Sequence, residues 1–152
     1  MSNTGIIYGV NGPVIYLKGD SGFKISEMVY VGPEHLVGEI IGLKKGMIWV
    51  QVFEETTGLK PGDTVTGTGD AISVLLGPGI IHNIFDGIQR PLEEIAKASG
   101  KYISRGVSVD SLDTEKKWNT HITVKEGDVV GPGSVIAETQ ETDSILHKSM
   151  VP

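Results

Sequence analysis

The sequence predicts a mainly β fold, with a small N-terminal six-stranded closed barrel, a short helical connector and a second β region. Twenty-one of the 152 residues are glycine, about twice the usual ~7 %, which favours many tight turns. Thirteen of these glycines lie in residues 1–70, where apolar runs of strand length alternate with turn signals. Closure into a barrel is expected there because it leaves no exposed sheet edge.

Five apolar runs and the short segment Thr64–Thr66 define the barrel strands expected in residues 1–70. Met47–Phe53 is the clearest, because Ile48, Val50 and Val52 occupy alternate positions and are all β-branched, as a core-facing strand side requires. Turns such as Asn11-Gly12-Pro13 separate the runs. The expected strands are Gly5–Val10, Val14–Leu17, Lys24–Val31, Leu36–Leu43, Met47–Phe53 and Thr64–Thr66.

Residues 71–106 are interpreted as a connector between the barrel and the second β region. Ser73–Leu76 is expected to be a short strand that ends at Gly77-Pro78-Gly79. Apolar residues between Ile80 and Ile88 recur at helical spacing, broken by Gly87, so a first short helix is expected here, as one of the one or two helices of the connector.

A second helix is expected over Leu92–Ala98. Glu93 and Glu94 suit its first turn, where carboxylates interact favourably with the helix dipole. Pro91 fits the first helical position and Gly100 fits the end.

Residues 107–152 return to β signals. Trp118, in a polar stretch, is interpreted either as an interface residue or as local packing. The expected strands are Ile122–Val124, Val129-Val130, Val135–Glu138 and Ile145–Val151.

Composition excludes several classes of function. The chain has no cysteine, so disulfides, thiolate catalysis and zinc–cysteine sites are ruled out. Its net charge of −6 argues against a nucleic-acid partner, which would need a basic surface. Because no apolar run approaches the ~20 residues of a membrane helix, we expect a soluble, cytoplasmic chain.

No phosphate-binding loop of the form G-x-x-x-x-G-K-[ST] is present. The one Gly-Lys pair, Gly100-Lys101, is followed by tyrosine and has Ile95 where the first glycine belongs. Gly77-Pro78-Gly79 is interpreted as a turn, with a ligand loop as the less favoured alternative.

The histidines show no metal-binding spacing. His35, His82, His121 and His147 are scattered, and Asp143 would join His147 only on a helix, where the sequence indicates a strand. We therefore predict no metal ligand.

The remaining polar candidates have structural interpretations. Glu54 and Glu55 are expected on a strand, where neighbours point to opposite sides and cannot enter one site. Arg90, beside a helix start, is expected to be structural, and Trp49 to lie in the core or on a barrel face. No catalytic or cofactor-binding residue is predicted.

Several long segments resemble the catalytic A subunit of archaeal (A-type) and vacuolar (V-type) rotary ATPases. The F-type relatives have a looser version of Asp86–Leu92, so this segment favours the A/V branch. The matching segments are Gly9–Val14, Met28–Gly32, Leu36–Ile41, Val52–Asp63, Ser73–Ile81, Ile84–Glu93, Ser104–Val107, Leu112–Trp118 and Lys125–Pro152.

This resemblance implies a place in a rotary machine. Residues 1–70 would be the crown barrel, residues 71–106 would lead toward the nucleotide-binding core, and residues 107–152 would begin the outward "bulge" region. In the family, A and B subunits alternate in an A3B3 head, the bulge faces peripheral-stalk subunits, and Mg-ATP hydrolysis or synthesis is coupled to proton or sodium transport. The complex is attached peripherally to the cytoplasmic face of the membrane.

The family's phosphate-binding loop, catalytic glutamate and magnesium-positioning residues all follow the bulge region, whereas this sequence ends at Pro152. No family catalytic residue can be assigned here, and the chain is expected to be a fragment without ATPase activity. Catalysis is expected of the complete subunit, which would be an ATP-driven ion-translocating ATPase or ATP synthase.

Two alternatives come from other functional classes. One is a free-standing β-barrel binding module. The other is a biotinyl or lipoyl carrier, because residues 124–142 resemble half of a barrel-sandwich. In such a carrier a lysine at the hairpin tip becomes acylated, but here Glu141 stands at that position and cannot form the amide. Lys148 lies several residues beyond it in the sequence. Such an incomplete barrel-sandwich would leave strand edges open, so disorder, strand swapping or self-association of the tail is expected.

Overall fold

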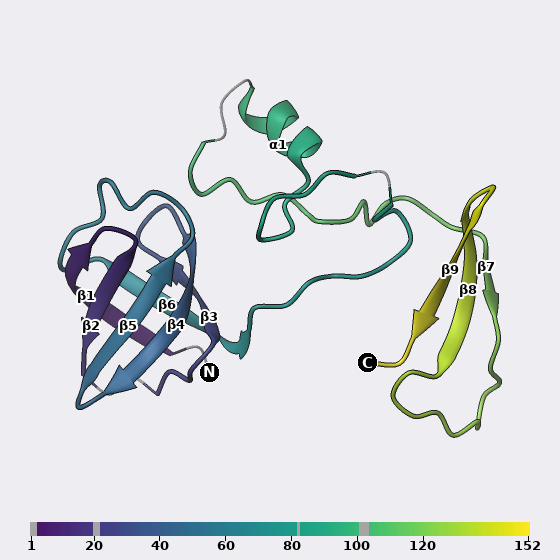
Figure 1. The fold of residues 1–152 in the computed structure, drawn as a ribbon, viewed down its shortest axis with the longest axis horizontal. Coiled ribbons are helices and arrows are strands. Elements are labelled where there is room, and N and C mark those ends of the chain that lie inside the picture. Colours follow the sequence, from purple (N-terminus) through teal and green to yellow (C-terminus); the bar gives the residue numbers. More distant parts are fainter. Residues whose placement is uncertain (1–2, 20–21, 82, 101–103) are drawn as a thin grey trace. The chain divides into compact units, whose positions relative to one another are not determined.

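The computed structural model describes residues 3–19, 22–81, 83–100 and 104–152. It is mainly β, with a closed six-stranded barrel, a three-stranded sheet and, within the described ranges, one α-helix (Figure 1). The chain forms two compact units, Met1–Ser73 with Ile103–Val107 and Val74–Tyr102 with Ser108–Pro152.

The first unit is the barrel, and its six strands confirm the predicted architecture. Every neighbouring pair is antiparallel, in the order β1-β2-β5-β4-β3-β6. The third strand begins later than predicted and the sixth continues further. The strands are β1 (Thr4–Asn11), β2 (Val14–Lys18), β3 (Glu27–Val31), β4 (Leu36–Lys44), β5 (Met47–Val52) and β6 (Thr64–Ala71).

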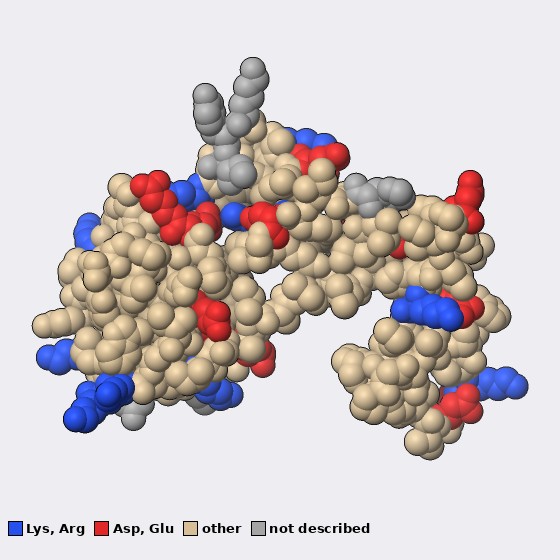
Figure 2. Space-filling view, in the orientation of Figure 1, with Lys and Arg blue, Asp and Glu red and all other residues tan. Residues whose placement is uncertain are grey.

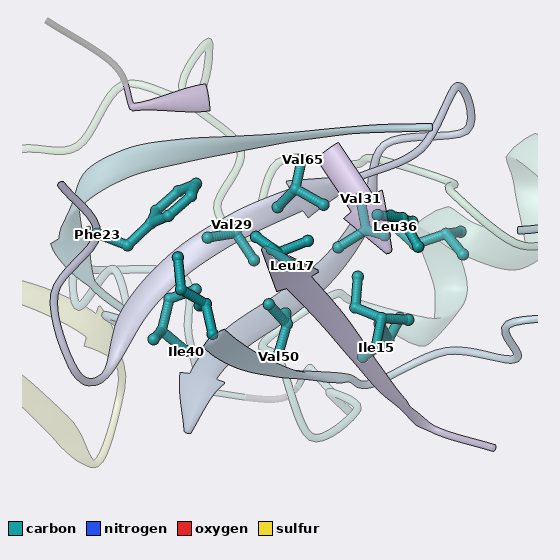
Figure 3. Close-up of a cluster of buried hydrophobic side chains, with 12 residues drawn as sticks. Ile15, Leu17, Phe23, Val29, Val31, Leu36, Ile40, Val50 and Val65 are labelled. Atoms are coloured by element: carbon teal, nitrogen blue, oxygen red, sulfur yellow. The ribbon is translucent and has the colours of Figure 1, made fainter. Parts of the chain in front are cut away.

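Alternation along the strands fills the barrel with aliphatic side chains, to which the β2–β3 loop adds the ring of Phe23 (Figure 3). In β5, Ile48, Val50 and Val52 are buried, as the sequence predicts, while Trp49 points to the outer face and is half-buried. The core consists of Ile7, Ile15, Leu17, Phe23, Val29, Val31, Leu36, Ile40, Ile48, Val50, Val52 and Val65.

Closure of so small a barrel needs sharp bends and close strand approaches. The register shifts once in each of the β1–β2, β4–β5 and β3–β6 pairings, with the extra residues on β1, β4 and β6, and such irregularities bend a strand and increase its twist. Gly38 permits one close approach, since a Cβ there would lie 2.8 Å from the carbonyl oxygen of Gln51.

The second unit contains the helix and a small antiparallel sheet of order β7-β8-β9. The predicted helix is confirmed, with Glu93 and Glu94 in its first turn and Gly100 as its C-cap, whereas Pro91 is the N-cap, one position before the first helical residue where it was expected. The elements are α1 (Leu92–Ser99), β7 (Thr120–Ile122), β8 (Val135–Thr142) and β9 (Ile145–Met150).

Two predictions for the connector are wrong. Ser73–Leu76 is not a strand, because the Gln89 side chain takes the place of a neighbouring strand: its Oε1 accepts the Leu75 N–H and its Nε2 donates to the Leu75 carbonyl, both at 2.6 Å. The described residues between Ile80 and Ile88 form turns rather than a helix, and Ile84 remains 67 % exposed.

The strand expected at Val129-Val130 is also wrong. The preceding turn is closed by the Lys125 N–H donating to Asp128, and Val129 is fully exposed without a neighbouring strand. No helix in the described part of the chain is long and apolar enough to cross a membrane.

Candidate functional site

An arginine from the end of the connector is bound to the barrel. The Arg105 guanidinium donates through Nη2 to Glu34 Oε1 at 2.9 Å and through Nη1 to the carbonyl oxygens of Glu55 and Thr57. These contacts join residues about fifty to seventy positions apart in the chain. We call this contact the Arg105 anchor, and it places 104–107 in the barrel unit.

Gly106 completes the Arg105 anchor. Its N–H donates to Glu54 Oε2 at 3.0 Å, and its φ of +67° lies in the left-handed region. A Cβ at this position would lie 2.3 Å from the Glu34 carbonyl oxygen, so only glycine fits.

The two adjacent glutamates, Glu54 and Glu55, follow β5 in a loop, so the prediction that they lie on a strand is wrong. Leaving the strand lets Glu54 bind Gly106 while Glu55 supplies its carbonyl oxygen to Arg105. The pair therefore has a structural part in the Arg105 anchor.

A second group of polar contacts lies in the turn at Asp86–Arg90. The Asp86 carboxylate accepts the N–H groups of Ile88 and Arg90 and pairs with Arg90 Nε at 2.8 Å. Burial alone would raise the pKa of Asp86, but the Arg90 and Ile88 hydrogen bonds and the Arg90 charge hold it below its ordinary 3.8. Arg90 thus has the structural role that the sequence predicts.

This turn should lose stability in acid. Because the folded-state pKa of Asp86 is lowered, its contribution is fully present above the ordinary pKa of 3.8 and is lost as pH falls through the lower folded-state value. The amide shifts of Ile88 and Arg90, followed by NMR, should titrate together below that pH. In Asp86→Asn this titration should be absent, and its persistence would contradict the assignment to Asp86.

A third group of contacts joins the turn at Gly77-Pro78-Gly79, called the glycine turn from here on, to the β7-β8-β9 sheet. Glu141 Oε1, near the end of β8, accepts the N–H groups of Gly79 and Ile81 at 2.9 and 3.1 Å. The Glu141 side chain is 2 % exposed, and its Oε2 lies 3.7 Å from His147 Nδ1 on β9. The position where a carrier would present its lysine thus holds a carboxylate turned inward.

The glycine turn is confirmed as a turn, but its N–H groups already bind a carboxylate of the chain itself. The described residues contain no group of three or more His, Cys, Asp or Glu side chains able to hold a metal ion.

The remaining predicted candidates are dispersed. His35 lies edge-on to Tyr30 at a centroid distance of 6.1 Å, His121 belongs to β7 and His147 to β9, while His82 lies outside the described residues. The segment at His147 is a strand, as predicted, so Asp143 does not share a helix face with it.

Trp118 lies beside the glycine turn in the second unit. A methyl group at Gly79 would lie 3.4 Å from its Cζ2, and Lys116 Nζ lies 4.1 Å from the ring centroid. Gly79, Lys116 and Trp118 all border a cavity of about 790 Å³ within this unit. These contacts give Trp118 a role in local packing.

An aromatic face covers the outside of β1, β2 and β5. Tyr16 and Trp49 are cross-strand partners in edge-to-face contact at 6.5 Å, and Lys18 lies 5.4 Å from the ring centroid of Tyr8, which is 61 % exposed. A Cβ at Gly42, opposite Trp49, would lie 3.3 Å from the indole, so glycine gives the ring room. Figure 2 shows this side of the barrel largely uncharged, with charged groups toward its margins.

Sequence reasoning missed the Arg105 anchor and the buried carboxylate of Glu27. Glu27 is 1 % exposed and accepts the N–H groups of Lys24 and Gly69. A charged residue at the start of an otherwise apolar run is the signal that could have indicated it. Arg105 has no comparable local signal, because all its described partners are distant in sequence.

The closed barrel and the second sheet match two domain models of one family. Residues 7–69 match the β-barrel domain of the ATP synthase alpha/beta family, and residues 109–152 match the barrel-sandwich domain of ATP synthase alpha/beta subunits. The chain belongs to the ATP synthase alpha/beta family.

The relatives place it in the A/V branch of that family. It is 51 % identical over its whole length to the V-type ATP synthase alpha chain of Halothermothrix orenii, and 49 % identical over its whole length to the A subunit of the A-type ATP synthase of Methanopyrus kandleri. It is 52 % identical over 99 % of its length to V-type ATP synthase alpha chain 2 of Clostridium tetani. The chain spans 26 % of each of these relatives and corresponds to their N-terminal portion.

Proposed function

We propose that this chain is the structural and assembly portion of the catalytic A subunit of an ion-translocating A/V-type rotary ATPase or ATP synthase. The observation that carries the proposal is the similarity to A-type and V-type alpha or A chains along its whole length. The complete subunit would bind Mg-ATP and couple its hydrolysis or synthesis to proton or sodium transport, at the cytoplasmic face of the membrane.

The barrel would contact neighbouring subunits of an A3B3 head through side chains rather than through added strands. A closed barrel pairs each strand on both sides, so its edges offer no free backbone ladder. The aromatic face around Tyr8, Tyr16 and Trp49 supplies rigid, partly apolar contact area of the kind enriched at interfaces. The second unit would face peripheral-stalk subunits or, through the outer edges of β7 and β9, another copy of the chain.

Tyr8→Ser should weaken the affinity for a B-type subunit by a factor of about ten or more, because it removes an exposed aromatic ring from the proposed contact face. Titration of the B-type subunit, followed by sedimentation or native mass spectrometry, measures the affinity. Tyr30→Ser is the matched control, since Tyr30 is an exposed tyrosine on β3, opposite β2 in the strand order. Equal affinities for the two variants would contradict the assignment of this face.

Calorimetric titration with Mg-ATP tests whether this portion of the subunit binds nucleotide. We expect no binding heat, because the described residues offer neither a phosphate-binding loop nor a metal cluster and the glycine turn is filled by Glu141. Binding in the micromolar range would show that this portion carries a nucleotide site and would overturn the proposal of a purely structural role.

A further inference from the structure

The turn at Gly77–Ile81 has the geometry of an anion-binding site. The N–H groups of Gly79 and Ile81 converge on a single oxygen atom, Glu141 Oε1. Gly79 has φ +102°, a conformation that glycine adopts readily, and its carbonyl oxygen accepts a hydrogen bond from Asn83 Nδ2 at 2.7 Å. Backbone N–H groups that converge in this way form concavities that bind anions.

The anion comes from the chain itself, 62 positions away from Gly79. Glu141 reaches the turn from β8, and its side chain is only 2 % exposed. A buried carboxylate needs hydrogen-bond donors to offset its lost hydration. The two N–H groups meet that need for Oε1, while Oε2 faces His147 Nδ1 at 3.7 Å.

We propose that the Gly77–Ile81 turn is a carboxylate-binding site and that Glu141 is its resident ligand, forming a latch between the connector and the β8–β9 hairpin. Charge-assisted hydrogen bonds to backbone N–H groups are stronger than neutral ones, which suits a contact that fixes two distant segments. The latch lies within the second unit and does not depend on the function proposed for the barrel.

Hydrogen exchange in the 152-residue chain tests the latch directly. In Glu141→Ala, the amides of Gly79 and Ile81 should exchange at least tenfold faster than in the unsubstituted chain, while the amides paired between β8 and β9 keep their protection. Glu138→Ala is the matched control, since Glu138 lies on the same strand but pairs with Lys148 at 3.8 Å, away from the turn. It should leave the Gly79 and Ile81 amides unchanged.

Acetate provides the test of ligand chemistry. Glu141→Ala leaves space at the turn, so added acetate should shift the Gly79 and Ile81 amide resonances saturably and restore part of their protection, whereas the unsubstituted chain should not respond. Glu141→Gln, whose carbonyl oxygen accepts more weakly, should give intermediate exchange rates and keeps the test available if Glu141→Ala does not fold. Unchanged exchange in these variants, or no acetate response in a folded Glu141→Ala, would overturn the proposal.

Discussion

Gly67→Ala should destabilise the barrel by about 2–4 kcal/mol, because the new methyl group would displace a buried carboxylate. A Cβ at Gly67 would lie 2.2 Å from Glu27 Oε1 and 2.8 Å from Phe23 Cε1. Glu27 accepts the N–H groups of Lys24 at 2.8 Å and Gly69 at 3.0 Å, so it ties the β2–β3 loop to β6. Moving it would leave two donors and a buried charge without partners.

The cost of the Gly67 substitution can be measured by urea unfolding. Trp49 lies in the barrel and Trp118 in the second unit, so a Trp118→Phe background makes tryptophan fluorescence report on the barrel alone. Gly9→Ala is the matched control, because its Cβ would meet Tyr16 at an ordinary contact distance of 3.8 Å. Similar unfolding midpoints for the two variants would show that Glu27 is not held as described.

Gly106→Ala should release the segment 104–107 from the barrel at a cost of about 2–3 kcal/mol. The methyl group would overlap the Glu34 carbonyl oxygen, and alanine would have to hold φ +67°. Retreat of the segment breaks the Gly106–Glu54 hydrogen bond and pulls Arg105 away from Glu34. Loss of about 2 kcal/mol raises the open population roughly thirtyfold.

Trypsin reports this opening, because Arg105 is itself a cleavage site and proteolysis follows the open population when closing is fast. Cleavage after Arg105 should accelerate at least tenfold in Gly106→Ala. Gly62→Ala separates backbone strain from steric overlap, since Gly62 also has positive φ but nothing lies within 4 Å of its added Cβ. Equal cleavage rates in Gly106→Ala and the unsubstituted chain would exclude the Arg105 anchor.

Much of the barrel was predictable because its signals are local. Alternation of the kind seen at Ile48, Val50 and Val52 determines which side of a strand is buried, and a one-residue slip would expose it. Asn11-Gly12 and Lys45-Gly46 place positive φ where the chain must reverse. The helix was equally predictable from the sequence, because Pro91 and Gly100 mark its ends.

The connector was harder to predict because apolar character alone does not choose a partner. Ser73–Leu76 has the composition of a strand, yet the partner of Leu75 is the Gln89 side chain. The residues between Ile80 and Ile88 have helical spacing, but in that region Asp86 binds the N–H groups of its own turn, which competes with helix formation.

By itself, the sequence determined the six-stranded barrel, the short helix and the resemblance to A-type and V-type catalytic subunits, because these depend on periodicity, turn residues and long ordered motifs. Only the tertiary structure revealed that Arg105 returns to the barrel, that Gly67 makes room for Glu27 and that Glu141 fills the glycine turn. Each of these contacts joins residues about forty or more positions apart. Local pattern carries no information about such pairs, because their geometry exists only once the chain has folded.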